Sequence, residues 1–302
     1  MHTCLAVPDC APFLAQELGT TADPVGDWLA ADTLPTPPLL AFARQVLPHA
    51  REVRAESINA WADQIAESII GHFPDNQPWR LHLWPQYGEG RAGEHRCALI
   101  RESLTLRLKK RRRSLLRMLE AGDGPFRPET SLVQVVLTAP DTGLISTAPA
   151  PQPADLRAII SSFTAGAVPV AEDKSAPSRA FAKLVESELR LGMAIERGNR
   201  CVDLGASPGS WSYVALERGA SVIAVDRSPL RDDLMRHPNL QFHQGDAFKF
   251  KPERPVDWLI CDVIAAPQRS IELLLEWLHA RLMRQFVVTI KFKGSDEYPL
   301  LT

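Results

Sequence analysis

After Asn199, five apolar runs rich in β-branched residues each end in an acidic or lysine side chain. In chain order these side chains are Asp203, Asp226, Asp246, Asp262 and Lys291. Helical patterns alternate with the runs, which predicts a parallel sheet with helices on both faces, the doubly wound, Rossmann-like α/β fold. Ligands of such sheets bind outside the carboxyl ends of the strands. We therefore expect the five side chains to gather around one crevice.

The first run leads into a glycine-rich turn that reads DLGASPGSW from Asp203 to Trp211. Glycines permit close approach of the backbone to a ligand, and the helix that follows offers free N–H groups. The G-x-x-x-G spacing, interrupted by Pro208, favours an amino-acid-sized group over a pyrophosphate and disfavours a nicotinamide-dependent oxidoreductase. Asp226 can accept from two ribose hydroxyls and Asp246 from the amine of adenine. The alternative is that the turn only closes a loop.

Together with Asp226, the segments VDLGASPGSW, GDAF, CDVIAAP and FVVTIKFKG resemble the FtsJ-like ribose 2′-O-methyltransferases, which use S-adenosylmethionine. The resemblance covers roughly residues 175–298. It implies a catalytic Lys-Asp-Lys-Glu tetrad, of which Lys183, preceded by a Ser-Arg-Ala segment, matches the first lysine. Asp262 and Lys291 match the aspartate and the second lysine. The segments APSRAFAKLVE and GDAFKFKP are most similar to the members that methylate cytidine ribose in large-subunit ribosomal RNA and carry an N-terminal THUMP RNA-binding domain.

The resemblance implies a role for each residue of the crevice. A ribose hydroxyl is a poor nucleophile at neutral pH, so a base must take its proton as the methyl group transfers. We expect Lys291 to be that base, with Lys183 and Asp262 positioning the hydroxyl. Solvent-facing roles for both lysines, and Lys293 as the base in place of Lys291, remain alternatives. The residues expected to bind the cofactor are Asp203, Gly205, Ser207, Pro208, Gly209 and Trp211 at its methionine end, Asp226 at its ribose and Asp246 at its adenine.

One tetrad member has no counterpart. The family's glutamate lies on a later strand, whereas this sequence ends at Thr302, and Glu297 is too close to Lys291 to replace it. We expect either a shortened protein or an incomplete version of a longer one. A non-catalytic RNA-binding protein that retains the methyltransferase fold is therefore the main alternative function. Base methylation is a lesser one, because the loop after Asp262 lacks the Asn-Pro-Pro-Tyr pattern.

A second candidate site is a run of cations around residues 107–113. Leu104, Leu108, Leu115 and Leu119 can share one helical face and leave a cationic stripe opposite them. Such a stripe binds phosphates with salt-sensitive affinity. The alternative is an ordinary solvated helix face. The residues expected to contact RNA are Arg107, Lys109, Lys110, Arg111, Arg112 and Arg113.

Proline-rich connectors divide the chain into four expected parts. Residues 1–50 have no clear pattern, and 51–150 form an α+β module, THUMP-like by the resemblance. Residues 151–178 are a linker, and 179–302 form the methyltransferase domain, apparently without its last strands. In the module we expect a helix near 55–71, a strand at 79–84, a helix at about 94–120 and a hairpin at 131–147.

Composition sets limits on partners and location. The 34 Lys and Arg against 36 Asp and Glu give a net charge of −2, so nucleic-acid binding requires local segregation of charge. The 5 cysteines contain no CxxC pair, which favours reduced thiols over disulfides or a zinc site. We expect no metal, no membrane-spanning helix and no secretory signal, hence a cytoplasmic protein. The RNA partner is expected to be ribosomal RNA on the strength of the resemblance alone, and the oligomeric state is left open.

Overall fold

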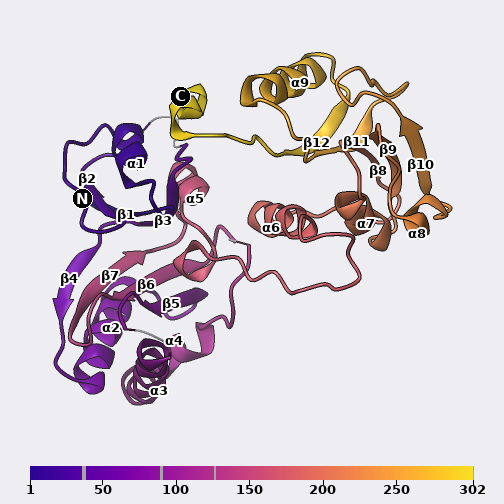
Figure 1. Cartoon of the computed structure of the whole chain (residues 1–302). Helices are drawn as coiled ribbons and strands as arrows, with labels where there is room; N and C mark the ends of the chain where they lie inside the picture. Colours follow the sequence, from indigo (N-terminus) through magenta and orange to yellow (C-terminus); the bar gives the residue numbers. More distant parts are fainter. Residues whose placement is uncertain (36–38, 89–90, 126, 302) are drawn as a thin grey trace. The chain divides into compact units, whose positions relative to one another are not determined.

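The computed structural model describes residues 1–35, 39–88, 91–125 and 127–301. Contacts divide the chain into two compact units, Met1–Val168 and Pro169–Thr302. The division falls inside the segment 151–178 that was expected to be a linker. Figure 1 shows the elements of both units.

The C-terminal unit is built on a five-stranded, wholly parallel sheet. Its strands are β8 (Arg200–Leu204), β9 (Ser221–Asp226), β10 (Leu240–Gln244), β11 (Val256–Cys261) and β12 (Met283–Val288). They lie in the order β10-β9-β8-β11-β12. The chain moves outward from β8 to β10 and then resumes on the other side of β8, so the switch point lies between β8 and β11. The predicted Rossmann-like α/β fold is therefore confirmed.

Helices cover both faces of this sheet. They are α6 (Phe181–Leu191), α7 (Ser210–Glu217), α8 (Asp232–Met235) and α9 (Pro267–His279), and a 3-10 segment, η2, spans Ser295–Leu301. On β11, Trp258 and Ile260 pack in the cluster that contains α7, whereas Leu259 and Cys261 pack with Trp277 of α9. A strand buried on both faces needs an apolar run, and apart from Asp257 near its start β11 is apolar up to Cys261, so that Asp262 follows directly after its end.

Two boundaries in this unit differ from those that the sequence pattern predicts. The apolar run FVVTIKF predicts a strand at 286–292, but the strand is Met283–Val288; the pattern before it predicts a helix at roughly 268–283, but the helix ends at His279. The strand pairs with β11, which ends at Cys261 opposite Val288. Beyond that point no partner strand remains, so Lys291 lies in the coil after β12 rather than within the strand.

The N-terminal unit contains two sheets. Strands β1 (His2–Ala6), β2 (Trp28–Ala31) and β3 (Ala43–Leu47) form an antiparallel sheet in the order β2-β1-β3, with α1 (Ala11–Leu18) following β1. The second sheet has the order β4-β7-β6-β5. It consists of β4 (Arg51–Arg54), β5 (Trp79–Pro85), β6 (Ser131–Leu137) and β7 (Thr142–Ala148). The antiparallel pairing of β6 with β7 confirms the predicted hairpin.

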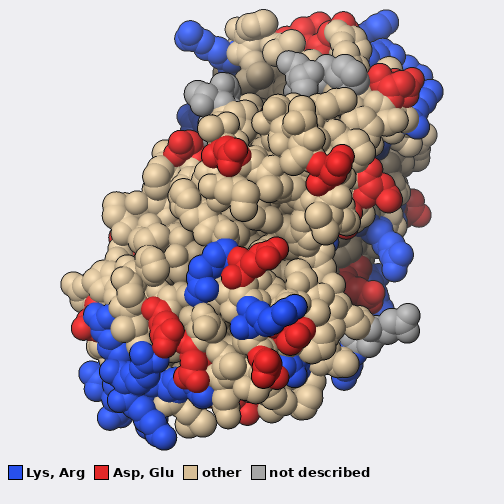
Figure 2. Space-filling model, turned by 90° about the vertical axis from the view of Figure 1, so that its left-hand side faces the viewer, with Lys and Arg blue, Asp and Glu red and all other residues tan. Residues whose placement is uncertain are grey.

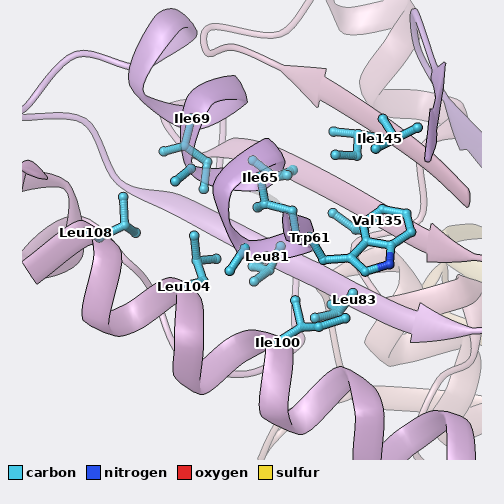
Figure 3. Close-up of a cluster of buried hydrophobic side chains, with 14 of the residues drawn as sticks. Trp61, Ile65, Ile69, Leu81, Leu83, Ile100, Leu104, Leu108, Val135 and Ile145 are labelled. Carbon is cyan, nitrogen blue, oxygen red and sulfur yellow. The ribbon is translucent and has the colours of Figure 1, made fainter. Parts of the chain in front are cut away.

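The core of this unit lies between the four-stranded sheet and the helices α2 (Ile58–His72) and α3 (Ala92–Arg111). Figure 3 shows Ile65 of α2 and Leu104 of α3 directed into a cluster with Leu81 and Val135 of the sheet. The expected single helix at 94–120 is broken at Arg112 into α3 and α4 (Arg113–Met118).

The two tryptophans of β5 pack in the interior of this unit. Trp79 is fully buried and its Nε1 donates to the carbonyl of Leu115 at 2.7 Å. Trp84 is also buried, in a small cluster with Leu47 and Val136. Both residues therefore serve the core rather than an exposed base-stacking surface.

Buried polar side chains join residues 1–50 to the rest of the N-terminal unit. Gln134 of β6 donates to the carbonyl of Val46 at 2.8 Å, and Gln45 donates to the carbonyl of Ser161 at 3.0 Å. Gln45 and Gln134 have 0% and 1% exposed surface, so these hydrogen bonds are out of reach of water. The segment after β7, with α5 (Ala154–Ile159) and η1 (Thr164–Gly166), is thereby part of the same unit.

No helix within the described residues is long and apolar enough to cross a membrane. Across the same residues, no group of three or more His, Cys, Asp or Glu side chains is placed to hold a metal ion. The five cysteines are all free thiols.

Candidate functional site

The centre of the site is a carboxylate held between two lysines. Lys183 Nζ donates to both carboxylate oxygens of Asp262 at 3.0 Å each. Lys291 Nζ lies 3.1 Å from Asp262 Oδ1 and donates to the Asp262 carbonyl at 2.6 Å. The three residues come from the start of α6, the end of β11 and the coil after β12. We call them the Lys-Asp-Lys cluster.

Exposure differs across this cluster. The side chains of Lys183, Lys291 and Asp262 are 49%, 29% and 16% exposed, so the carboxylate is the innermost member. Burial acts to raise the pKa of Asp262, but the hydrogen bonds from Lys183 and Lys291 outweigh it and the pKa lies below its usual value. The carboxylate is therefore ionised at neutral pH, and the cluster with both lysines protonated carries one net positive charge.

Two contacts fix α6 so that Lys183 faces Asp262. Trp211 Nε1, in the first turn of α7, donates to the carbonyl of Ala180 at 2.8 Å. The hydroxyls of Ser178 and Ser210 lie 2.7 Å apart. Both contacts tie the segment just before α6 to the start of α7. A residue expected to touch a ligand, Trp211, thus also positions a lysine of the cluster.

A cavity of about 320 Å³ adjoins the Lys-Asp-Lys cluster. Its wall includes Asp262 and Lys291 together with the turn between β8 and α7. Of the residues expected at the methionine end of a cofactor, those that line it are Asp203, Gly205, Ser207, Pro208 and Trp211. The sequence reasoning did not assign Ser178, Ala180 and Ser210 to this wall. Their positions directly before α6 and after Gly209 were the available signal.

The glycines of this turn have different roles. Gly205 has φ +75°, and a Cβ there would lie 3.0 Å from the Cα of Val263, so its lack of a side chain keeps the cavity open toward the loop after β11. Gly209, with φ +109°, does not line the cavity. A Cβ at Gly209 would instead approach Leu234 and Leu230, so this glycine serves packing against α8.

A second cavity of about 220 Å³ contains the other two strand-end aspartates. Asp226 lines both cavities, and its carboxylate accepts from the backbone N–H groups of Ser207 at 3.0 Å and Ser228 at 2.9 Å. Asp246 accepts from the N–H of Phe248 at 3.0 Å and from Arg227 at 3.1 Å. The Phe248 hydrogen bond is the largest cause of the lowered pKa of Asp246. Both carboxylates therefore present fixed acceptors.

Asp203 lies beneath the first cavity. It is 1% exposed and accepts from the hydroxyl of Ser212 at 2.7 Å. Burial raises the pKa of Asp203 to about 7, although hydrogen bonds from Ser212 oppose the shift. Asp262, which follows the neighbouring strand β11, keeps its negative charge because lysines reach it, whereas none of the described residues forms a salt bridge with Asp203.

The cation segment 107–113 divides into two groups. Lys109, Lys110, Arg111 and Arg113 are exposed. Arg107 forms an ion pair with Asp63 of α2, and Arg112 binds Asp75 and the carbonyl of Ile70 at 2.8 Å each. Figure 2 shows a dense group of Lys and Arg side chains at the lower edge of one face, at the level where Figure 1 draws α3. Of the predicted set, four cations therefore face solvent and two hold α3 and α4 to the α2 region.

The order of the strands and the glycine-rich turn between β8 and α7 are those of a Rossmann-like methyltransferase fold. Residues 176–292 match the sequence model of the FtsJ-like methyltransferases. Those residues of this chain therefore belong to the FtsJ-like methyltransferase family. S-adenosylmethionine is the methyl donor of that family, and the two joined cavities, with fixed acceptors at Asp226 and Asp246, fit a molecule with an amino-acid end, a ribose and an adenine.

Similarity to individual proteins extends beyond this domain. Ribosomal RNA large subunit methyltransferase M of Thauera aminoaromatica is 31% identical over 256 residues, which cover 83% of this chain and 66% of that protein. The protein of the same name from Halorhodospira halophila is 40% identical over 121 residues, or 39% of this chain and 36% of its own length. This chain thus spans between about a third and two thirds of these relatives. Among solved structures, TrmN from Thermus thermophilus aligns over 95% of this chain and 88% of its own, at 13% identity and a TM-score of 0.35.

Proposed function

We propose that this chain is an S-adenosylmethionine-dependent methyltransferase that acts on a ribose 2′-hydroxyl of large-subunit (23S) ribosomal RNA. The observation that carries the proposal is the Lys-Asp-Lys cluster, of which Asp262 and Lys291 line the cavity of about 320 Å³. Similarity to proteins named as large-subunit ribosomal RNA methyltransferases supports the substrate class. Such a substrate implies a cytoplasmic location.

In this proposal Lys291 acts as the general base. S-adenosylmethionine, when bound, supplies an electrophilic methyl group on a positively charged sulfur. The neutral Nζ of Lys291 takes the proton of the 2′-hydroxyl while the ribose oxygen forms its bond to the methyl carbon and the carbon–sulfur bond breaks. Lys183 and Asp262 hold the hydroxyl in line, so catalysis is mostly alignment.

The cofactor assignments are part of the same proposal. The methionine end would lie against Gly205, Ser207 and Pro208, above Asp203. Asp226 would accept from the ribose hydroxyls and Asp246 from the adenine amine. The fixed acceptor geometry of both carboxylates, each already oriented by a backbone N–H, supports these assignments.

RNA binding is proposed for the N-terminal unit. We infer that residues 51–150 are a THUMP-like module and that Lys109, Lys110, Arg111 and Arg113 contact phosphates. The exposure of these four cations supports the inference. Arg107 and Arg112 would contribute by holding the helix that carries them.

The test is methyl transfer from S-adenosylmethionine to unmodified large-subunit ribosomal RNA transcribed in vitro, with nucleosides identified by mass spectrometry. We expect one 2′-O-methylated nucleoside from the wild-type protein. Lys291→Ala should lower the rate by roughly 100-fold or more, because the base is lost. Lys293→Ala is the matched control and should stay near the wild-type rate, since Lys293 is exposed outside the cluster.

Two outcomes would count against the proposal in different ways. If Lys293→Ala abolishes transfer and Lys291→Ala does not, the base is misassigned. If the wild-type protein binds S-adenosylhomocysteine and RNA but transfers no methyl group to any RNA, the chain is instead the non-catalytic RNA-binding protein considered from the sequence.

A further inference from the structure

Ile264 is an exposed apolar residue on the wall of the site. Its 90% exposure is the highest among the large hydrophobic residues of the described chain. It lies two residues after Asp262 and lines both cavities. Isolated exposed apolar residues are ordinary on protein surfaces, but this one borders the cluster to which the proposed function assigns the chemistry.

The backbone around Ile264 is held on both sides. The carbonyl of Asp262 accepts from Lys291, and Val263 packs against the bare Cα of Gly205. After Ile264, the carbonyl of Ala266 accepts from Arg269 and Ser270 at the start of α9. The side chain of Ile264 is therefore presented at a defined place beside the Lys-Asp-Lys cluster, although it contributes little to the core.

We propose that Ile264 packs against the nucleobase of the acceptor nucleotide and so helps to bind that nucleotide next to the Lys-Asp-Lys cluster. This inference rests on the proposed function, because the cluster can recruit a nucleotide only if the acceptor is RNA. The faces of nucleobases are apolar and pack on side chains when a nucleotide is unstacked. An aliphatic side chain offers no hydrogen-bond donor or acceptor, so the contact positions a base without reading its identity.

The donor is the competing occupant of this surface. The proposed donor contacts, Asp226 and the turn at Gly205, belong to the inner walls of the cavities. Ile264 lines both cavities, and its 90% exposed surface includes the part that faces them, so exposure alone does not separate a donor from an acceptor. Titration with S-adenosylhomocysteine distinguishes the two occupants, because only a donor contact would make its affinity depend on Ile264.

The experiment compares Ile264→Ala, Ile264→Val and Leu275→Ala in steady-state methylation of unmodified large-subunit ribosomal RNA. Leu275 lies on α9, is 45% exposed and lines neither cavity, so it is a matched loss of an exposed apolar side chain. We expect Ile264→Ala to raise KM for RNA about tenfold with little change in kcat, since the contact is the same in the ground and transition states. Ile264→Val should lie between, and Leu275→Ala should match the wild type.

Calorimetric titration with S-adenosylhomocysteine provides the second readout. The Kd should be the same in the wild type and Ile264→Ala. A fall in its affinity parallel to the rise in KM would overturn the inference, because Ile264 would then cover the donor. An unchanged KM for RNA in Ile264→Ala would also overturn it while leaving the proposed function intact. If the wild-type protein methylates no RNA, both the function and this inference fail.

Discussion

At the scale of single residues, Asp203 in β8 and Asp262 just after β11 show how two aspartates that lie close together can have pKa values shifted in opposite directions. Asp262 is reached by two lysines and stays ionised, whereas Asp203 is enclosed and its pKa rises to about 7. Residues 203 and 260 are register partners in the paired strands β8 and β11, so the two carboxyls lie close along the same sheet edge. Because the Asp203 carboxyl is buried and forms no salt bridge among the described residues, folding favours its protonated form.

Because the pKa of Asp203 is raised in the folded protein, we expect the stability of the fold to depend on pH. Asp203→Asn should remove this dependence. Unfolded, the Asp203 carboxyl has its ordinary pKa of 3.8, and folded it has a pKa of about 7. Between those values the folded state binds more protons, so Asp203 lowers stability as pH rises through that window. The melting temperature of Asp203→Asn minus that of the wild type should therefore increase from about pH 4 to about pH 7.

Scanning fluorimetry across this pH range makes the measurement. Asp23→Asn, at an exposed loop position, is the control for the loss of one surface carboxylate. A constant difference for Asp203→Asn across this range would mean that the Asp203 carboxyl is already ionised in the folded protein.

At the scale of elements, the turn between β8 and α7 joins the donor cavity to the Lys-Asp-Lys cluster. Gly205 packs against Val263, the residue that follows Asp262. A side chain at position 205 would therefore push on the backbone of the loop after β11 rather than on a movable side-chain tip. The shape of the cavity depends on two elements that approach closely only because one of them lacks a Cβ.

A pair of substitutions separates this contact from backbone strain. Gly205 and Gly198 have φ of +75° and +85°, but a Cβ at Gly198 would meet nothing within 4 Å. Each change to Ala should cost roughly 1 kcal/mol or more through strain at positive φ and lower the melting temperature by a few degrees. Only Gly205→Ala should also weaken binding of S-adenosylhomocysteine, by about tenfold or more, as measured by calorimetry. Equal affinities in the two variants would refute the role of the Gly205–Val263 contact.

At the scale of the whole molecule, charge is segregated while the total stays near zero. The net charge is −2, yet four exposed cations lie within residues 109–113. Arg107 and Arg112, in the same run of sequence, are neutralised by Asp63 and Asp75. RNA affinity should therefore come from a local field at one end of α3 and not from the molecule as a whole.

Two multiple variants test this division. Changing Lys109, Lys110, Arg111 and Arg113 to Gln should lower RNA affinity about tenfold or more and reduce the slope of log affinity against log salt by up to about 3. Changing Arg107 and Arg112 to Gln should instead lower the melting temperature, because Asp63, Asp75 and the Ile70 carbonyl lose their hydrogen bonds from these two arginines. Filter binding at several salt concentrations, with melting curves in parallel, measures both. Equal salt slopes in the wild type and the four-site variant would exclude the exposed cations as the phosphate contacts.

Much of the C-terminal unit was predictable because its signals are local. A two-faced parallel strand requires an apolar run, so the strands and the polar residues that end them are visible in the sequence. The rule that ligands bind outside the carboxyl ends of parallel strands predicted that Asp226, Asp246 and Asp262 lie along one edge. The order of the strands came only from the structure. Boundaries were less predictable where pairing decides them, as at β12, whose length is set by the end of β11.

By itself, the sequence determined the α/β class, the glycine turn and the identity of the residues at the strand ends, because periodicity and turn chemistry act over a few residues. Only the tertiary structure decided which side chains meet. Lys183 lies 79 positions from Asp262, and Arg107 lies 44 positions from Asp63. Contacts over such separations depend on how helices pack on the sheet, and no local pattern encodes them. The same packing decides that Arg112 forms an ion pair with Asp75, whereas its neighbours in sequence, Arg111 and Arg113, remain exposed to solvent.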